Sequence, residues 1–201
     1  MWALVEDNNV TQVFTKPKAI TIGDNQYPSN IMSVWSAEDL EAIGIYEVVV
    51  DNTNLKNKEY YINTNQSFNF ANDTITASYG TATAKPLDNS GSGEDLVKGL
   101  KTLHKENVDN EAYGLLLPSD WMVVRKEEAG TAMPSDWTTF RTGVRTTAAD
   151  MKTKIDAVSD VDALAALYVY NDADPPVRPL GEFPSHDPMI IFRCWCNSCN
   201  S

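Results

Sequence analysis

The cysteines near the C-terminal end of the sequence come closest, by type and spacing, to a chemical site. Cys194, Cys196 and Cys199, with His186 upstream, could supply the ligands of a Cys3His zinc site. The gap between Cys194 and Cys196 is tighter than the gaps of structural zinc knuckles. Two other interpretations stay open: intermolecular pairing of the thiols, or free thiols in a polar terminus after an apolar strand over 189–192. We therefore assign neither a metal nor a cofactor.

Motifs for catalysis are missing from the sequence. It contains no Gly-rich phosphate loop, no dinucleotide fingerprint and no serine nucleophile elbow. His104 is expected on the polar side of a helix, exposed to solvent, and no cysteine or serine pairs with it in sequence. The acidic pairs Glu127-Glu128 and Asp172/Asp174 are expected to be solvated surface charges. The sequence thus favours a protein that is not an enzyme.

Aromatic and arginine side chains gather in the second half of the chain. Arg141 and Arg145 are one helical turn apart, so they lie on one face of a helix. Tryptophan and arginine are the residue types that most often anchor protein interfaces. The cluster predicts a partner-binding surface, with the alternative that Trp137 is core and the arginines pair with local acids. Its members are Trp121, Arg125, Trp137, Arg141 and Arg145.

The charge of the chain bounds its partners. The 201 residues include 28 acidic and 16 basic side chains, for a formal net charge of -12. Binding to nucleic acid or to an anionic membrane surface needs the opposite sign. The longest apolar run, 163–170, is far shorter than the ~20 residues of a bilayer-spanning helix. We expect no nucleic-acid partner and no membrane partner.

A change in composition predicts two modules. Residues 1–87 are rich in Asn, Thr, Tyr, Val and Ile, and read as a small β-rich module. Residues 88–93 are a Ser/Gly linker, and 94–170 are a helical module. Residues 171–201 contain several prolines and the cysteines, and are expected to be an extended tail. The fold class is therefore α+β.

The first module reads as short strands with one short helix. Asp7-Asn8-Asn9 predicts a hairpin turn after the first strand. Ser36 is expected to cap a helix that ends near Gly44. The remaining strands are predicted at 19–22, 47–50, 59–62, 67–70 and 74–79.

The second module reads as a set of helices. Residues 94–116 form the first, which Pro118 ends, and 122–125 stay ambiguous between strand and helix. Ser135 is expected to cap the most regular helix, 135–158, and a final helix follows the cap at 159–162.

A short repeat adds to this pattern. Pro118-Ser119-Asp120-Trp121 recurs as Pro134-Ser135-Asp136-Trp137, which indicates two helix starts with Trp packing back, or alternatively a duplicated ligand site.

The segment 120–134, followed by Phe140-Arg141 and Arg145, resembles the C-terminal region of tail assembly chaperone and tail-fibre assembly proteins of tailed phages. Residues 27–31 and 35–46 are similar to the small N-terminal domain that accompanies such regions. Ala129 stands where that pattern has threonine.

This resemblance implies a protein that binds a phage tail or tail-fibre subunit during assembly in the host cytoplasm. The alternative is a structural component of the virion tail, such as a fibre, fibre adaptor or peripheral baseplate subunit. A homo-oligomer is compatible with both. An enzyme such as a host-surface hydrolase is the third alternative, against which the lack of a catalytic motif argues.

Overall fold

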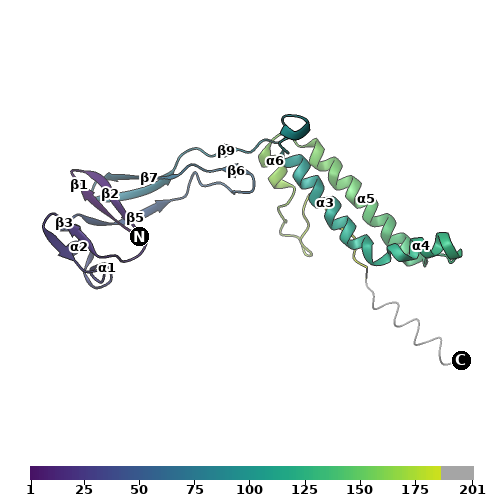
Figure 1. Ribbon diagram of the computed structural model, residues 1–201, viewed down its shortest axis with the longest axis horizontal. Helices are drawn as coiled ribbons and strands as arrows, with labels where there is room; N and C mark the ends of the chain where they lie inside the picture. Colours follow the sequence, from purple (N-terminus) through teal and green to yellow (C-terminus); the bar gives the residue numbers. More distant parts are fainter. Residues whose placement is uncertain (187–201) are drawn as a thin grey trace, which may run out of the picture. The chain divides into compact units, whose positions relative to one another are not determined.

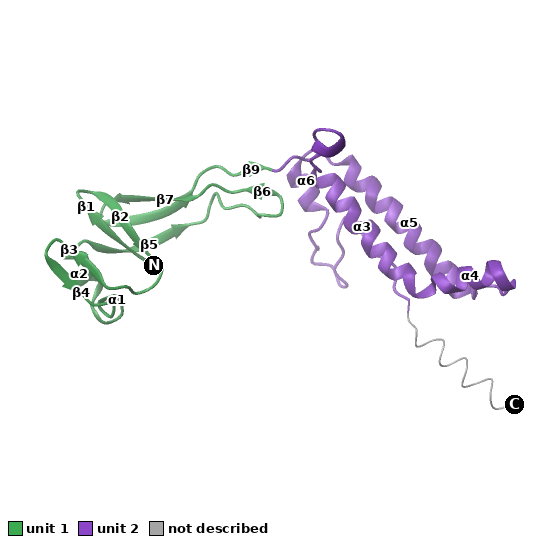
Figure 2. Ribbon diagram, viewed as in Figure 1, with its two compact units in different colours: residues 1–84 green, residues 85–201 purple. Residues whose placement is uncertain are grey.

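The computed structural model describes residues 1–186, and the chain divides into two compact units, residues 1–84 and 85–201 (Figure 2). The first unit is β-rich and the second is helical, so the α+β fold class is confirmed (Figure 1). The division falls between Ala84 and Lys85. Each unit is described by itself below.

The first unit is built on a curled five-stranded sheet in the order β2-β1-β5-β8-β7. The β5–β8 pair is parallel, whereas β1–β2, β1–β5 and β7–β8 are antiparallel. Two small antiparallel pairs, β3–β4 and β6–β9, accompany it. The strands are β1 (Trp2–Glu6), β2 (Asn9–Phe14), β3 (Ile20–Ile22), β4 (Asn25–Tyr27), β5 (Ile45–Asp51), β6 (Tyr61–Ile62), β7 (Gln66–Ala71), β8 (Thr74–Tyr79) and β9 (Thr83–Ala84).

Tight turns set the register of the two hairpins of this sheet. Asp7 and Asn8 have φ values of 49° and 62°, the left-handed geometry that a two-residue hairpin turn requires. The predicted turn after β1 is therefore confirmed. Asn72 and Asp73 repeat this geometry, with φ values of 50° and 54°, between β7 and β8.

Both faces of the sheet are covered by apolar side chains. One cluster joins β1, β2 and β5 to the β3–β4 hairpin and two short helices, α1 (Ile31–Val34) and α2 (Ala37–Glu41). The other cluster centres on Ala3, Val48, Ile75 and Ala77. The sequence predicted a single helix here and missed α1, whose four residues are too few to show a helical period.

Ser36 caps α2 as predicted, because its Oγ accepts a hydrogen bond from the backbone N–H of Asp39 at 3.2 Å. Gly44 follows the helix with φ +83°. A Cβ at that position would lie 2.8 Å from the carbonyl oxygen of Val5, so the chain can return toward β1 only through glycine here.

The second unit consists of α3 (Leu100–Leu116), α4 (Asp120–Ala129), α5 (Ser135–Ala157) and α6 (Val161–Ala166). The 3-10 turns η1 (Gly93–Asp95) and η2 (Leu117–Ser119) precede α3 and α4.

The segment 122–125, which the sequence left ambiguous between strand and helix, is helical. The N-cap of α5 is Pro134 and Ser135 is already helical, so the predicted Ser135 cap is wrong. Asp160 caps α6, and its carboxylate accepts the backbone N–H of Ala163 at 2.7 Å.

The first predicted helix begins later than expected, at Leu100, because the chain before it is bonded as a loop. Ser90 and Val97 exchange backbone hydrogen bonds, and the side-chain oxygen of Asn89 accepts from the N–H of Gly99. A Cβ on Gly99 would lie 2.4 Å from the carbonyl of Asp88. The Ser/Gly stretch 88–93, predicted as a linker, is thus part of the second unit.

The core of the second unit lies where α3 packs against α5, with α6 beside them. His104 belongs to this core: it is 4% exposed, and its Nδ1 lies 2.7 Å from the hydroxyl of Tyr168. The prediction of a solvated His104 is wrong, because α3 is covered on that side. The buried residues are Leu100, Val108, Ala112, Phe140, Val144, Ala148, Met151, Ile155, Val161, Leu164 and Leu180.

The tail over 171–186 has no helix or strand, in agreement with the predicted extended segment. It is nevertheless packed against the helices. Leu180 is 2% exposed, and its N–H donates to the carbonyl of Leu167. Pro184 lies so close to Gly143 that a Cβ there would meet its ring at 3.3 Å. The segment therefore returns along α5.

The apolar face of α5 is the spine of the second unit, as its sequence period predicts. Ile155 is fully buried, so Ile155→Asp, like Met151→Asp, places an unpaired charge in the core. We expect a loss of about 3 kcal/mol or more in the free energy of unfolding, measured by urea titration. Thr153→Asp on the exposed side of the same helix is the control, and equal losses in both variants would show that this face is not core.

Candidate functional site

The guanidinium of Arg141 lies inside the second unit, where α3 passes through η2 into α4. Its side chain is 6% exposed. Nη1 donates to the carbonyl oxygen of Leu116 at 2.9 Å and to the hydroxyl of Ser119. Nη2 lies 2.8 Å from a carboxylate oxygen of Asp120. One cation therefore binds the end of α3, the turn and the first residue of α4.

This arrangement corrects the predicted role of Arg141. A side chain that is 6% exposed and whose Nη1 and Nη2 both donate within its own fold is poorly placed to bind a partner. The pairing of Arg141 with a local acid, the alternative named from the sequence, is the one that the structure shows. Arg145 differs, since it is exposed and one of its nitrogens reaches only the carbonyl of Arg141, at 3.5 Å.

A shallow hollow lies between α4 and α5 beside Arg145. Lys126 and Arg145 bring cationic groups to it, and Glu127 brings one carboxylate. Thr138 and Thr142 add hydroxyls, although both hydroxyls already donate to backbone carbonyls of α5 or its N-cap. We call this the cationic hollow, and its full lining is Val123, Lys126, Glu127, Met133, Thr138, Arg141, Thr142 and Arg145.

Helix α4 borders the cationic hollow and has no buried residue, although it carries large apolar side chains. Trp121, Val123 and Val124 are 54%, 38% and 52% exposed, and we call them the α4 apolar surface. The guanidinium of Arg125 lies 4.7 Å from the centre of the Trp121 ring, a cation–π contact that holds the ring in place. Arg125 Nε is buried and has no hydrogen-bond partner among the described residues.

Trp137 is placed apart from this surface, against the returning tail. The ring of His186 stacks on it at a centroid distance of 3.9 Å, and Phe140 meets both rings edge-on. His186 Nε2 also lies 3.7 Å from Asp136. Trp137 is therefore a packing residue here. Cys194, Cys196 and Cys199 lie outside the described residues, and within 1–186 no cluster of three metal-ligating side chains occurs.

Both copies of the Pro-Ser-Asp-Trp repeat begin helices, α4 and α5, as the repeat predicts. Neither serine caps its helix through its side chain. Ser119 instead lies in the Arg141 corner, with its hydroxyl donating to Leu116.

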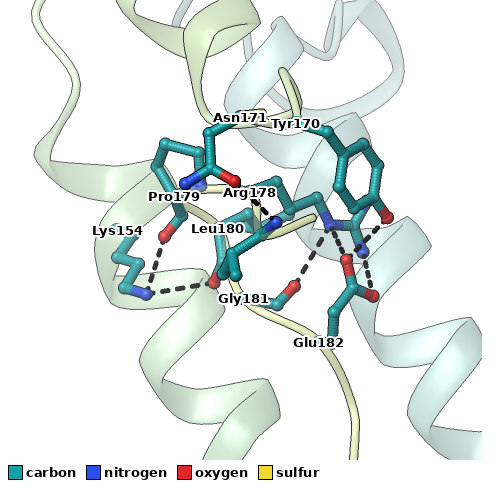
Figure 3. Close-up of polar contacts among 9 residues, drawn as sticks. Lys154, Tyr170, Asn171, Arg178, Pro179, Leu180, Gly181 and Glu182 are labelled. Atoms are coloured by element: carbon teal, nitrogen blue, oxygen red, sulfur yellow. Dashed lines mark hydrogen bonds and ion pairs between the residues drawn. The ribbon is translucent and has the colours of Figure 1, made fainter. Parts of the chain in front are cut away.

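A second polar cluster fastens the chain that follows α6 (Figure 3). Lys154 donates to the carbonyl oxygens of Pro179 and Leu180 at 2.8 and 3.1 Å. Arg178 Nε donates to the carbonyl of Gly181 at 3.1 Å, and its guanidinium pairs with the carboxylate of Glu182. Lys154 of α5 therefore holds this segment to the helices through its backbone, and Arg178 closes it on itself.

Glu182 also accepts a hydrogen bond from the Tyr170 hydroxyl at 2.6 Å. That bond is the main reason why the pKa of Tyr170 lies above its ordinary value, since ionised Tyr170 could not donate to a carboxylate. No sequence motif predicts this cluster, because its members are spread over 154–182.

No protein-family model, curated protein or solved structure matches the chain. None of the helices between residues 1 and 186 combines the length and the apolar character that a bilayer-spanning helix requires.

The Arg141 corner yields a stability prediction. Arg141→Ala removes the buried cation from the Leu116 carbonyl, the Ser119 hydroxyl and Asp120, and leaves the carbonyl with the Ser119 hydroxyl as its remaining side-chain donor. We therefore expect a loss of about 2–4 kcal/mol in the free energy of unfolding. Arg145→Ala, on the exposed side of the same helix, should change it by no more than about 0.5 kcal/mol. Thermal and urea unfolding of both variants measure the difference. Comparable losses in the two would contradict the assignment.

The loop cluster yields a pH prediction. Because the folded pKa of Tyr170 is raised, the Tyr170–Glu182 bond stabilises the loop from neutral pH up to the ordinary tyrosine pKa of about 10, and this stabilisation is lost as the pH rises through the raised value. In an ultraviolet titration, Glu182→Gln should move one late tyrosine ionisation to lower pH. Tyr170→Phe identifies that step by removing it. Tyr60, whose pKa is raised mainly by burial, should not respond.

Proposed function

We propose that this chain is a non-enzymatic protein of tailed-phage assembly that binds a tail or tail-fibre subunit through α4 and the adjoining cationic hollow. One observation carries the binding part of the proposal: α4 has no buried residue, yet it exposes Trp121 and Val124. Large apolar side chains that are exposed together on one helix and bordered by polar residues indicate an interaction surface. The phage class of partner comes from the sequence resemblance alone.

The α4 apolar surface has the chemistry of an interface anchor. The Trp121 ring is already oriented by Arg125, so little rotamer freedom is lost when a partner covers it. Two further large apolar side chains precede Trp121 in the sequence, Tyr113 near the end of α3 and Leu117 in η2, and they are 61% and 51% exposed. Together these side chains offer apolar area to a partner at the end of α3 and along α4.

The cations of the hollow favour a partner that carries an acidic group beside its apolar contact. Lys126 and Arg145 are local cations on a chain whose net charge is -12, and neither has an ion pair within the described residues. They suit a carboxylate on the partner beside its apolar contact. The acidic side chains elsewhere on the surface keep a transient complex soluble, because copies of it repel one another. In this proposal the chain covers an adhesive surface of its subunit in the host cytoplasm until that subunit is incorporated.

A second candidate is a structural component of the virion tail. The observation that favours it is the first unit, a separately packed sheet with apolar clusters on both faces, which an assembly factor would not need in order to bind through α4. Such a unit could attach the chain to the particle. Mass spectrometry of purified virions distinguishes the candidates, because a pure assembly factor leaves no abundant peptides there.

The test of the proposed function is copurification of the tagged chain with the products of neighbouring phage tail genes. Trp121→Ser combined with Arg145→Glu should abolish capture of the tail subunit with little change in melting temperature, since both side chains are exposed. Val49→Ser combined with Lys16→Glu changes an exposed pair in the first unit and is the matched control. Unchanged capture by the α4 variant would refute this surface, and no capture of any tail product by the wild-type chain would refute the function.

A further inference from the structure

A second hollow, which is mostly apolar, lies at the other end of α5, between the end of α6 and the loop that follows it. Its lining is mostly apolar carbon, and three of its large side chains, Val169, Tyr170 and Val177, are 64%, 50% and 49% exposed. We call it the loop hollow, and its lining is Ala166, Val169, Tyr170, Asn171, Val177, Arg178 and Pro179.

The walls of the loop hollow are preformed. The N–H of Asn171 donates to the carbonyl of Val177, and the side-chain oxygen of Asn171 accepts the N–H of Val177, both at 2.9 Å. Arg178 and Lys154 fasten the far side of the loop (Figure 3). A ligand that enters this hollow therefore loses little binding energy to ordering the loop.

Two exposed acids lie in the chain next to the loop hollow. Asp172 and Asp174 belong to the short loop between Asn171 and Val177 and have no ion pair with any described residue. Arg178, the one cation in the lining, is neutralised by Glu182. Asp172 and Asp174 are thus unpaired acids next to the hollow, whereas Lys154 is engaged by backbone carbonyls and Arg178 by Glu182.

We propose that the loop hollow binds a basic segment of a partner protein, in which an apolar side chain enters the hollow and flanking lysines or arginines meet Asp172 and Asp174. The apolar lining supplies the affinity and the carboxylates supply the selection. This site is separate from the α4 surface and does not depend on it, so the two could hold different segments of one partner.

The same charges argue against the other occupants. An acidic segment or a nucleic acid would meet Asp172 and Asp174 without compensation. A second copy of this chain carries the same net charge of -12, so its approach is opposed by repulsion. A basic partner segment is the occupant that both the apolar and the charged features fit.

The test uses the full chain and synthetic peptides, followed by amide chemical shifts in NMR. The probe peptide has two leucines between lysines. One control replaces the lysines by glutamates, and the other replaces the leucines by serines. We expect the probe alone to shift the amides of Val169, Tyr170, Asn171 and Val177. Binding should weaken several-fold between about 50 and 500 mM salt.

Variants separate the apolar and the charged contributions. Val169→Ser combined with Val177→Ser should weaken probe binding by about tenfold or more, because it removes apolar area that both residues expose. Asp172→Asn combined with Asp174→Asn should weaken it about three- to tenfold and reduce its salt dependence. Glu38→Gln combined with Glu41→Gln, exposed acids on α2 of the first unit, is the matched control and should leave binding unchanged.

Three results would overturn the proposal. The first is equal binding of the glutamate peptide, and the second is shifts that cluster outside the loop hollow or are absent. The third is a dependence of the Val169–Val177 shifts on protein concentration alone, which would make a second copy the occupant. None of these results bears on the α4 surface, so a failure here leaves the copurification test of the proposed function intact.

Discussion

The buried guanidinium of Arg141 is the interaction on which the helical unit depends most. At the end of α3 the last carbonyl groups have no partner within their own helix, and a buried carbonyl without a donor is costly. At Leu116 the donors are the Ser119 hydroxyl and Arg141, which reaches across from α5 and also binds Ser119 and Asp120. Because the corner is held from its inner side, α4 can continue outward with no buried residue of its own. The exposed Trp121 and Val124 are therefore a consequence of how the corner is fastened.

The same solution recurs at the other end of α5. Lys154 donates to the carbonyls of Pro179 and Leu180, and Arg178 donates to that of Gly181, where the chain turns back after α6. The chain has 16 basic side chains against 28 acidic ones, and several of the bases are directed at backbone oxygens and local carboxylates. The acids that remain without partners, such as Asp172 and Asp174, set the sign of the surface around the loop hollow. Several basic side chains bind backbone oxygens and carboxylates within the fold, so the unpaired charges left on the surface are mostly acidic.

The sequence predicted those features that depend on local chemistry. The Asp7-Asn8 turn, the Ser36 cap and the period of α5 each need only neighbouring residues, and all three were identified. Features set by tertiary contacts were not. His104 was read as polar because the residues of α6 and the following chain that cover it are about sixty positions away. The sequence correctly predicts one helix that carries Trp137, Arg141 and Arg145. The helical period alone does not show that Trp137 and Arg141 pack within the fold whereas Arg145 is exposed. The Tyr170–Glu182 cluster has no sequence signal, because its partners meet only after the tail returns along α5.

The strand order of the first unit has a consequence for how that unit forms. The strand β5 pairs with β8, which is separated from it by β6 and β7, and β8 arrives together with β7 as one hairpin closed by Asn72 and Asp73. Until that hairpin docks, β1, β2 and β5 form a three-stranded sheet whose last strand has one side unpaired. An unpaired strand bearing Val48, Val49 and Val50 is a template for pairing with another chain. Association with another chain at β5 would therefore compete with completion of the sheet, and early formation of the β7–β8 hairpin would shorten the time for which that strand stays unpaired.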